Sequence, residues 1–500
     1  MAVPTLSVTP SAPVDLDVDV LVVGVTGGES PALASDDPAV AAAVGDLAAI
    51  GVTGAADELR RLPFPGGRPR SLALIGLGPA EAPDATGLRY AAGSAARQLT
   101  GVSSIALLLP IADEERLTAV LEGAGIGAWA YTEQRSASLA TTRLPAADVA
   151  VLSGLDGGAA LARARVVVEA AHLVRELVSA PPSQLYPGTL AERAVRLAEA
   201  AEHVSATVLD ETALAEGGYG GILAVGSGSA RPPRLVRIDY APPSASRHLA
   251  LVGKGITFDT GGLSLKPPAS MIGMKYDMTG AATVLAVTLA AAALALPVRL
   301  TAWLCIAENM PSGTAMRPND VLRIRGGRTV ENLNSDAEGR LVMADGLVAA
   351  SEEQPDAIVD VATLTGAARV ALGNRYVGAM GDTALVRTIV GIGDRVGEPF
   401  WHMPLPEELR PLLNSEVADI ANVKPGNTAG GMLIAGVFLR EFVGFAGEGA
   451  QRRRIPWAHL DIAGPASNDG AGYGYTGKGA TAIAVRSLIA LAESMAQPAA

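Results

Sequence analysis

The residues of this chain with the clearest capacity for chemistry lie in one short stretch, at positions 334–341. Asp336, Glu338 and Arg340 stand at alternate positions there, and alternate side chains of an extended segment point to the same side. We therefore expect these three side chains to converge on one point. Clustered negative charge costs free energy unless a cation compensates it. The stretch thus predicts a bound metal ion whose other ligands lie elsewhere in the chain.

A glycine-rich segment at positions 253–266 offers further candidates, directly after a predicted strand. It contains Lys254, Asp259 and Lys266, and Asp277 follows where an alanine-rich helix is expected to begin. Taken singly, each has an ordinary explanation as a surface lysine, a turn residue or a helix N-cap. Taken together with the two acids of the first stretch, they form a far more specific set.

Four carboxylates without a histidine or thiolate suit divalent ions such as Mg, Mn or Zn. That number exceeds what one ion usually needs, and two ions about 3.5–4 Å apart form an arrangement used for hydrolysis, with a bridging water as the nucleophile. Lys266 could polarise a scissile carbonyl, and Arg340 suits the binding of an oxyanion. The alternative is a solvated acidic patch with surface ion pairs. We favour metal-dependent hydrolysis, because perturbed charge clusters tend to mark functional sites.

The elements that must position these residues alternate between strands and helices, which predicts an α/β fold with a central, mostly parallel twisted sheet. We expect two domains, a smaller N-terminal α/β domain and a larger C-terminal α/β catalytic domain with its chemistry at strand ends. The expected ranges are 1–155 for the first domain, 156–182 for a linking helix and 183–500 for the second domain. Within the second domain, strands are expected at 222–225, 235–240, 248–252, 298–306 and 357–362, and helices at 189–201, 281–296, 341–353, 433–443 and 480–492.

Composition narrows the class of protein. Nearly half of the 500 residues are hydrophobic, which allows a large core, and the net charge of -12 argues against general nucleic-acid binding. The single cysteine, Cys305, permits no intramolecular disulfide, which fits a reducing compartment. The first residues lack the pattern of a signal peptide. The apolar run 281–300 approaches membrane length but ends in Pro297 and Arg299, so we interpret it as a buried helix followed by a strand. We expect a cytoplasmic protein without a membrane span.

At these residues the chain resembles the leucyl aminopeptidase family, which are cytosolic two-metal exopeptidases. The resemblance covers most of the chain after position 180, whereas the first domain matches only in its coarse α/β character. Its clearest parts, in chain order, are 252–265, 274–281, 308–313, 334–341, 362–367 and 457–464. One such stretch could arise by chance, but six in this order are highly specific.

The resemblance implies a set of metal ligands. These are Lys254, Asp259, Asp277, Asp336 and Glu338. One ion would be held by all of them except Asp336, and the other by Asp259, Asp336 and Glu338. Lys254 must then bind as a neutral amine, which requires that the cation and burial lower its pKa strongly. The implied metals are Mn or Zn, with Mg as a further option.

The resemblance also implies the catalytic and substrate-binding residues. Lys266 and Arg340 would be the catalytic pair, with Arg340 holding a bicarbonate ion that serves as general base. The substrate would be a short peptide whose free α-amine binds a metal near Asp277. The residues implied to bind it are Lys266, Met274, Asp277, Asn334, Thr363, Leu364, Gly366, Ala463 and Ala466. Because the pocket residues are apolar or small, leucine and similar side chains should be preferred. The family assembles as homohexamers, dimers of trimers.

Two other classes of function stay open. A DNA-binding or regulatory protein could keep this fold, although the acidic total charge weighs against it. A two-metal phosphoesterase could use a similar carboxylate set, and it would turn over phosphate esters but not aminoacyl amides. The chain also departs from the family pattern, with Ser335 where threonine is common and Asn319 where glycine is frequent. We expect His459 and Asp461, in a strand-like run, to be structural and not metal ligands.

Overall fold

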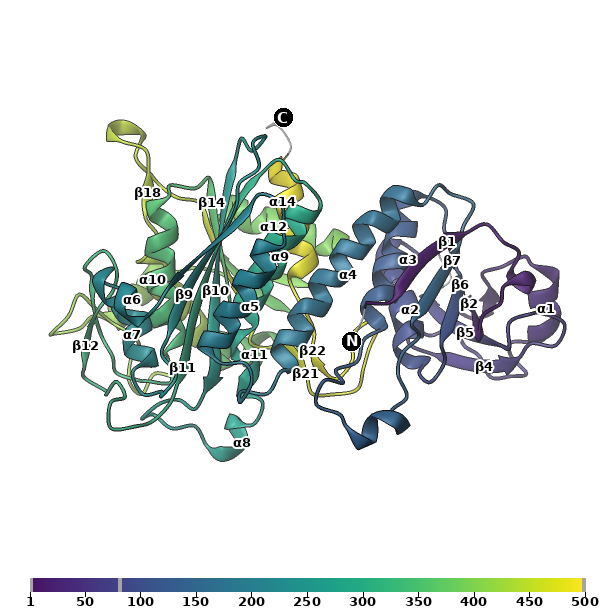
Figure 1. The fold of residues 1–500 in the computed structure, drawn as a ribbon, viewed down its shortest axis with the longest axis horizontal. Coiled ribbons are helices and arrows are strands. Elements are labelled where there is room, and N and C mark those ends of the chain that lie inside the picture. Colours follow the sequence, from purple (N-terminus) through teal and green to yellow (C-terminus); the bar gives the residue numbers. More distant parts are fainter. Residues whose placement is uncertain (1–2, 80–82, 497–500) are drawn as a thin grey trace. The chain divides into compact units, whose positions relative to one another are not determined.

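The computed structural model describes residues 3–79 and 83–496, which form two compact units. The first unit comprises the chain up to His172 together with Asn468–Gly479, and the second comprises Leu173–Ser467 and the chain from Ala480 onward. Figure 1 draws most of the first unit in purple to blue and the second in teal to yellow. The boundary falls inside helix α4 (Gly158–Ser179), within the segment expected to link the domains.

The first unit is built on a sheet with strand order β1-β7-β6-β2-β5-β4, and β3 pairs with β2. Its strands are β1 (Thr5–Thr9), β2 (Val20–Gly27), β3 (Ala32–Leu33), β4 (Leu59–Pro63), β5 (Ser71–Pro79), β6 (Ser104–Leu108) and β7 (Asp148–Leu152). Its helices include α1 (Pro38–Val44), α2 (Ala85–Gln98) and α3 (Glu114–Gly127), with 3-10 turns at Pro13–Asp15 and Ala137–Thr141. The central strands pair in parallel and are almost fully buried, as expected when helices cover both faces.

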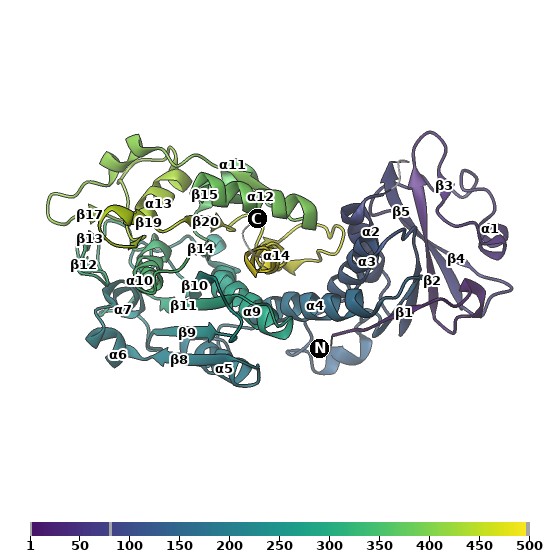
Figure 2. The ribbon, with the colours of Figure 1, turned by 90° about the horizontal axis from the view of Figure 1, so that it is seen from above.

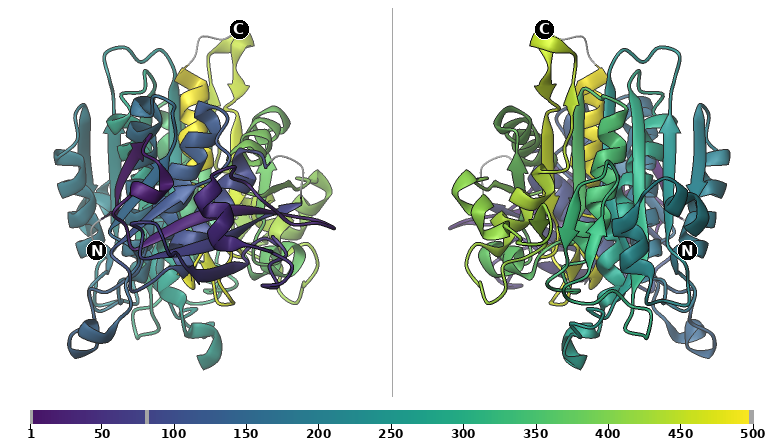
Figure 3. Two further views of the ribbon diagram at one scale, coloured as in Figure 1. Left: turned by 90° about the vertical axis from the view of Figure 1, so that its right-hand side faces the viewer. Right: turned by 90° about the vertical axis from the view of Figure 1, so that its left-hand side faces the viewer.

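The second unit is built on a larger mixed sheet with strand order β16-β15-β20-β14-β10-β11-β9-β8. The strands of this sheet are β8 (Val204–Leu209), β9 (Arg234–Tyr240), β10 (His248–Asp259), β11 (Arg299–Asn309), β14 (Ala357–Ala362), β15 (Val377–Gly381), β16 (Phe400–His402) and β20 (Trp457–Asp461). Strands β11, β10, β14 and β20 run parallel to one another, while β8, β9 and β15 are antiparallel to a neighbour. Figure 3 shows these teal and green strands running side by side. The predicted α/β class with a mostly parallel central sheet is confirmed.

Helices cover both faces of this sheet, and smaller elements edge it. The remaining elements are α5 (Pro187–Glu199), α6 (Glu211–Glu216), α7 (Gly220–Gly226), α8 (Pro268–Met271), α9 (Thr279–Ala293), α10 (Gly339–Glu352), α11 (Gly366–Leu372), α12 (Thr383–Val396), α13 (Gly431–Arg440), α14 (Val485–Ala496), β12 (Val321–Arg323), β13 (Thr329–Glu331), β17 (Ile420–Ala421), β18 (Phe445–Ala446), β19 (Arg453–Arg454), β21 (Ser467–Asn468) and β22 (Gly479–Ala480), with 3-10 turns at Met274–Met278, Glu407–Leu413 and Gly449–Gln451. In Figure 2, α7, α10 and α13 lie on one side of the strands, and α5, α9, α12 and α14 on the other.

The apolar run singled out in the sequence is a core helix. The stretch Met274–Ala293 is long and apolar enough to cross a membrane, but most of it is buried inside the protein. In helix α9 nearly every side chain from Thr279 to Ala291 is buried, and the chain continues into strand β11. The predicted sequence of a buried helix followed by a strand is therefore confirmed.

Two local predictions are wrong. Residues 222–225 lie in helix α7 and not in a strand, because a short apolar run has no period that separates the two structures. Asp345 on α10 supports the first turn of α7 by accepting a hydrogen bond from the Ile222 amide at 2.8 Å. The last helix begins at Val485 and not at 480, because Ala482 and Ala484 have positive φ angles of 62° and 70°, which interrupt a right-handed helix.

Candidate active site

Elements that lie far apart in the sequence bring the candidate ligands together. Asp259 is the last residue of β10, and Lys254 lies within the same strand. Asp277 lies in the 3-10 turn before α9, while Asp336 and Glu338 directly precede α10. Parallel strands end at a common edge of a sheet, where ligand-binding residues of α/β folds collect. The predicted placement of the site at strand ends therefore holds for these residues.

The stretch around Asp336 is not extended, contrary to our prediction. Glu338 has helical dihedral angles (φ -71°, ψ -36°), and Arg340 lies in the first turn of α10. Asp336 and Glu338 still converge with Asp259, because one oxygen of each carboxylate lies within 4.8 Å of the others. Arg340 does not join the convergence as predicted. Its Nη1 instead donates to the carbonyl oxygen of Asn422 at 2.6 Å.

Ser335 explains why the turn takes this shape. Its Oγ donates to the carbonyl oxygen of Gly261 at 2.7 Å and accepts from the Ser264 amide at 2.7 Å. The hydroxyl thus fastens the turn to the loop that follows β10. A tertiary contact of this kind overrides the local preference of the segment, and the exchange of threonine for serine noted in the sequence keeps the hydroxyl that makes it.

Two lysines lie between the carboxylates. Lys254 Nζ is 2.8 Å from Asp277 Oδ2 and 2.9 Å from Glu338 Oε1, and it donates to the Thr363 carbonyl oxygen at 3.0 Å. Burial lowers the pKa of Lys254, but the charges of Asp277 and Glu338 raise that pKa by more, so the net shift is upward. In this arrangement the ammonium group is the cation that the acids would otherwise lack.

Lys266 makes the same kind of contact on the other side of the cluster. Its Nζ is 2.8 Å from Asp259 Oδ2 and 2.5 Å from Asp336 Oδ1. Burial lowers its pKa, and the charge of Asp259 together with the hydrogen bonds to both acids raises it, again with an upward result. The two lysines thus bridge four acids, and the cluster holds more acids than cations.

Burial and the excess of acids raise the pKa values of carboxyl groups in the cluster. Burial, and then the negative charge of Asp259, raise the pKa of Glu338 to about 8. The pKa of Asp277 rises to about 6, chiefly through burial, although the charge of Lys254 opposes the rise. The pKa of Asp336 also rises, by burial and the charge of Asp259. Proximity of like charges in a buried site therefore disfavours the ionised acids unless a further cation binds.

The residues present fit divalent metal ions. Glu338 Oε2 is buried and has no hydrogen-bond partner among the described residues, so this oxygen is available as a ligand. Asp259 is already oriented, because its Oδ1 accepts from the Gly261 amide and from Asn309 Nδ2, both at 2.8 Å. Carboxylate oxygens held in this way by outer partners are typical of metal sites. Sequence reasoning gave Asn309 no role, although it lies in the stretch 308–313 that carries part of the family resemblance.

Arg340 is prepared for an anion. The side chain is buried, which lowers the pKa of its guanidinium to about 10, and Nε has no hydrogen-bond partner among the described residues. Asn422, which receives the Nη1 hydrogen bond, is itself held by Asn332 Oδ1 at 2.9 Å and by the Asn334 carbonyl oxygen at 2.8 Å. Asn422 therefore positions Arg340, a role that no nearby sequence motif indicated.

The expected substrate-binding residues gather around two loops beside the cluster. Thr363 Oγ1 donates to Asp277 Oδ1 at 2.7 Å, and the Leu364 amide donates to Asp461. A Cβ placed on Gly366 would meet no described atom within 4 Å, which indicates open space at the start of α11. The backbones of Ala463 and Met274 lie in the turn after β20 and in the 3-10 turn that carries Asp277.

Two further residues expected to bind substrate form hydrogen bonds with backbone amides. Asn334 Oδ1 accepts from the Asp336 amide at 2.9 Å and thereby supports the turn of the cluster. Ala466 is fully buried, and its carbonyl oxygen accepts from the Thr481 amide at 3.1 Å. His459, which we expected to be structural, pairs through Nδ1 with Asp360 Oδ1 at 2.5 Å inside the sheet.

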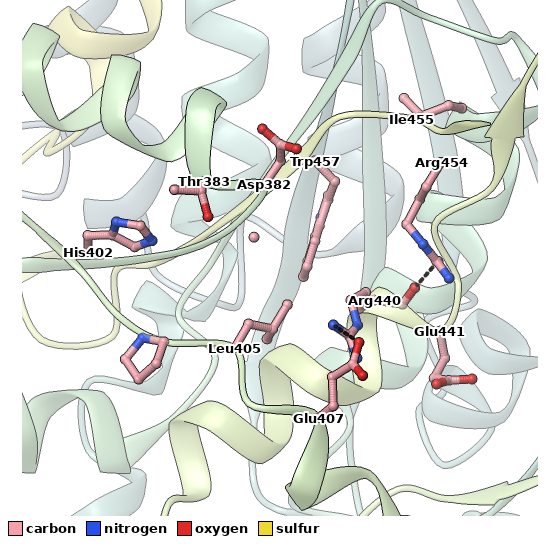
Figure 4. Close-up of a pocket in the computed structure, with 12 residues that line it drawn as sticks. Asp382, Thr383, His402, Leu405, Glu407, Arg440, Glu441, Arg454, Ile455 and Trp457 are labelled. Atoms are coloured by element: carbon pink, nitrogen blue, oxygen red, sulfur yellow. Dashed lines mark hydrogen bonds and ion pairs between the residues drawn. The ribbon is translucent and has the colours of Figure 1, made fainter. Parts of the chain in front are cut away.

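A separate cavity of about 430 Å³ lies at the opposite end of β20, where Trp457 begins the strand (Figure 4). In Figure 4 the side chains of Arg440 and Glu407 lie side by side at its wall, with 3.5 Å between Arg440 Nη1 and Glu407 Oε1. The carboxylate cluster instead lies where the parallel strands end, so this cavity is not the site of the metal chemistry.

The fold and the site together define a two-unit α/β protein with a buried carboxylate and lysine cluster suited to divalent metal ions. Residues 172–489 match the Cytosol aminopeptidase family, catalytic domain, and residues 22–138 match the Cytosol aminopeptidase family, N-terminal domain. The chain belongs to the cytosol aminopeptidase family. It is a hydrolase that removes residues from peptide N-termini in a metal-dependent reaction.

Full-length relatives and solved structures agree. The chain is 59% identical to a "Probable cytosol aminopeptidase" of Leifsonia xyli subsp. xyli, covering 99% of both chains. It is 56% identical to a "Probable cytosol aminopeptidase" of Clavibacter michiganensis subsp. michiganensis, covering 98% of this chain and 99% of the relative. It also resembles the structure "Bottromycin maturation enzyme BotP in complex with Mn", with a TM-score of 0.84, 38% identity and coverage of 96% of this chain and 100% of that one.

Proposed function

We propose that the chain is a leucyl-type aminopeptidase that removes leucine and other apolar residues from the N-termini of short peptides. The observation that carries this proposal is the meeting of Asp259, Asp336 and Glu338 oxygens within 4.8 Å, flanked by Lys254 and Lys266. We propose two Mn or Zn ions per chain, with Mg as a further option. The complex of the similar bottromycin maturation enzyme with Mn supports Mn for this site.

The metal ligands in this proposal are Lys254, Asp259, Asp277, Asp336 and Glu338, with Lys254 binding as a neutral amine because a bound cation would replace its ammonium group among the acids. Bound there, two divalent ions would supply a bridging water as nucleophile and polarise the substrate carbonyl. Asn309 holds Asp259 in place through the 2.8 Å hydrogen bond to Oδ1, and Thr363 holds Asp277 through the 2.7 Å hydrogen bond to Oδ1. These contacts keep the donor oxygens oriented before a ligand arrives.

Lys266 and Arg340 are the proposed catalytic pair. Lys266 has its ammonium group at the rim of the cluster with a pKa shifted upward, so it keeps its proton and donates to the substrate carbonyl oxygen as negative charge develops there. Arg340 would bind a bicarbonate ion as general base through its free Nε and the fork of its guanidinium. This anion accounts for the absence of a histidine or a spare carboxylate as base among the described site residues.

The selectivity for apolar first residues rests on the pocket. Met274, Thr363, Gly366, Ala463 and Ala466 are the proposed lining, and Leu364 the proposed contact to the peptide main chain. The open space beyond Gly366 leaves room for a branched side chain. A pocket of this kind discriminates among apolar side chains by about 1–3 kcal/mol per methylene. The free α-amine would bind beside Asp277. Asn334 supports the turn that carries Asp336, on the other side of the cluster, through its hydrogen bond to the Asp336 amide.

The proposal extends to assembly and location. We propose a cytoplasmic homohexamer, a dimer of trimers, that acts on short peptides and has no nucleic-acid or membrane partner. Large apolar side chains exposed on the second unit, such as Ile272 at 82% and Val370 at 89%, are suited to contacts between chains. Light scattering during gel filtration should give roughly six times the chain mass of 50.7 kDa, and the chain mass itself would contradict the hexamer.

The decisive experiment is hydrolysis of leucyl p-nitroanilide by the purified full chain. Activity should disappear on chelation and return on addition of Mn or Zn, and N-acetyl-leucyl p-nitroanilide should not react. The double variant Asp336→Asn, Glu338→Gln should be inactive, whereas Asp382→Ala, which removes an exposed helix cap far from the cluster, should keep full activity. Release from the acetylated substrate, or turnover of p-nitrophenyl phosphate alone, would refute the aminopeptidase. Salt-dependent binding to DNA without peptidase activity would favour a regulatory protein.

A further inference from the structure

We infer that Asp461 is the positioning residue that fixes both walls of the substrate pocket relative to the metal ligands. This inference rests on the proposed function, since it concerns the pocket assigned there. Asp461 is the last residue of β20, next to β14, and its side chain is fully buried. It contacts no carboxylate of the metal cluster, so its role has to be sought in the loops that it holds.

The carboxylate of Asp461 joins two loops that are almost one hundred positions apart in the chain. Oδ1 accepts hydrogen bonds from the Leu364 amide at 3.2 Å and from the Ala463 amide at 3.1 Å. Oδ2 accepts from Thr365 Oγ1 at 2.7 Å. Leu364 lies in the loop between Thr363 and Gly366, which line one proposed wall, and Ala463 belongs to the other, so a single side chain sets the separation of the two walls.

The contact with Thr365 also sets the direction of helix α11. Thr365 Oγ1 is the N-cap of that helix, because it accepts a hydrogen bond from the Ala368 amide at 3.0 Å. The same hydroxyl can donate its one proton only to Asp461 Oδ2. Both oxygens of residue 461 must therefore accept hydrogen bonds. A carboxylate has two accepting oxygens, whereas the carboxamide of asparagine has one oxygen and one NH₂ group that can only donate. Helix α11 begins at Gly366, an exposed residue of the proposed pocket with open space beside it.

The opposite end of the same loop is fastened to the metal cluster. Thr363 Oγ1 donates to Asp277 Oδ1 at 2.7 Å, and the Thr363 carbonyl oxygen accepts from Lys254 Nζ at 3.0 Å. The loop from Thr363 to Gly366 is thus held by metal ligands at one end and by Asp461 at the other. Its conformation links the place where the substrate amine would bind to the wall that would contact the first side chain.

A neighbouring aspartate shows what helix capping alone requires. Asp382 follows β15 and caps α12 by accepting from the Ala384 and Leu385 amides, both at 3.1 Å, while remaining exposed. Capping therefore needs no buried charge. A fully buried carboxylate costs free energy unless several donors compensate it, as the three donors to Asp461 do. Orientation of the two loops explains why a charge is buried at Asp461, whereas helix capping alone does not.

The test compares variants of Asp461 and Thr365 with the wild-type chain. For Asp461→Asn we expect kcat/KM on leucyl p-nitroanilide to fall by about tenfold, the equivalent of one lost buried hydrogen bond. The loss should lie mainly in KM, and the preference for leucyl over alanyl p-nitroanilide should shrink. Thr365→Val should reproduce this pattern, and Thr365→Ser, which keeps the hydroxyl, should restore wild-type selectivity. The metal content of each variant should stay that of the wild-type chain.

Asp382→Ala is the matched control, since it removes a helix cap in the same unit without touching the pocket. If Asp461→Asn and Thr365→Val lower only the melting temperature, as Asp382→Ala should, and leave selectivity and KM unchanged, Asp461 has no positioning role. Should Asp461→Asn fail to fold, the two Thr365 variants decide the question by the same readout.

A further variant separates failure of this inference from failure of the pocket assignment. Gly366→Val places a branched side chain into the open space and should shift the preference from leucine toward alanine. No shift in an otherwise active enzyme would show that the pocket lies elsewhere, which overturns the assignment on which the inference rests. A shift with Gly366→Val, but none with Asp461→Asn or Thr365→Val, would overturn the inference alone.

Discussion

Two buried charge clusters of this protein differ in how their charges are balanced. In the first unit, each oxygen of Glu122 on α3 is paired with a guanidinium, from Arg89 on α2 at 3.0 Å and from Arg163 on α4. In the second unit, Asp259, Asp277, Asp336 and Glu338 share only the ammonium groups of two lysines. Both clusters are buried, but the single carboxylate of the first is paired at both oxygens, whereas the second holds four acids against two lysines.

The difference separates a cluster that stabilises a fold from one that binds a ligand. Around Glu122 each carboxylate oxygen already has its cation, and helices α2, α3 and α4 are tied together as a result. Around Glu338 one carboxylate oxygen has no hydrogen-bond partner among the described residues, and the pKa of the acid is raised to about 8. Burial of charge is therefore not a sign of function by itself, whereas an excess of buried acids with an unpartnered oxygen points to a bound cation.

The largest expected effect comes from removing one charge of the unbalanced cluster. Glu338→Gln should lower kcat/KM on leucyl p-nitroanilide by about 10³-fold or more, because a proposed metal ligand loses its charge. The same variant should melt at a higher temperature than the wild-type chain in the presence of a chelator, because like-charge repulsion is relieved. A lower melting temperature under chelation would contradict the contrast between the two clusters.

The matched change at Glu122 in the first unit should lower stability and leave catalysis unchanged. Glu122→Gln leaves Arg89, which is only 6% exposed, without its counter-charge. We expect the free energy of unfolding to fall by about 3 kcal/mol, with kcat per folded molecule unchanged. Urea unfolding followed by fluorescence, combined with activity of the folded fraction, measures both quantities. A loss of kcat comparable to that of Glu338→Gln would remove the distinction.

The pH dependence of stability offers a smaller and separate test. The folded-state pKa of Glu338, about 8, lies above its ordinary value of 4.5, so the folded chelated protein holds this proton more tightly than the unfolded chain. The resulting stabilisation is fully present below about pH 4.5 and is lost as the pH rises through about 8. We expect the unfolding free energy of the chelated protein to fall by at least about 1.4 kcal/mol over this window, the equivalent of one pKa unit.

Two samples control that experiment. Glu338→Gln cannot titrate at this position and should lose a large part of the pH dependence. Saturation of the wild-type protein with Mn should have a similar result, because bound cations favour the ionised acids. A chelated wild-type protein whose stability rises with pH between about pH 4.5 and 8 would reverse the sign that the charge imbalance requires.

The smallest effect should follow from replacing Glu122 together with both of its arginine partners. The triple variant Arg89→Met, Glu122→Leu, Arg163→Met removes the three charges together, so neither guanidinium is left without Glu122. Well-packed apolar replacements of buried ion clusters are often neutral, so we expect a change in unfolding free energy within about 2 kcal/mol and unchanged kcat. Calorimetry and the leucyl p-nitroanilide assay measure the two outcomes. Loss of catalysis in this variant would show that the first cluster contributes more than stability.

Much of the site was predictable because it depends on residue type. Asp259, Asp277, Asp336 and Glu338 are all oxygen donors, and Lys254 and Lys266 recur in the same glycine-rich segment after a strand. Strands that alternate with helices also predicted that this segment lies at the edge of a parallel sheet. The error over 222–225 came from a run too short to show a period, and there α7 forms through its contacts with α10 and with Asp345.

The sequence by itself determined the α/β class, the oxygen-rich donor set and the excess of acids over lysines in that set. Only the tertiary structure decided that Glu338 is helical, that Arg340 binds Asn422, and that Asp461 holds Leu364 and Ala463. These partners are separated by 82 positions for Arg340 and Asn422 and by 97 for Leu364 and Asp461. Composition and local periodicity report the chemistry and the path of each segment, but contacts between distant segments arise from packing of the whole sheet and its helices.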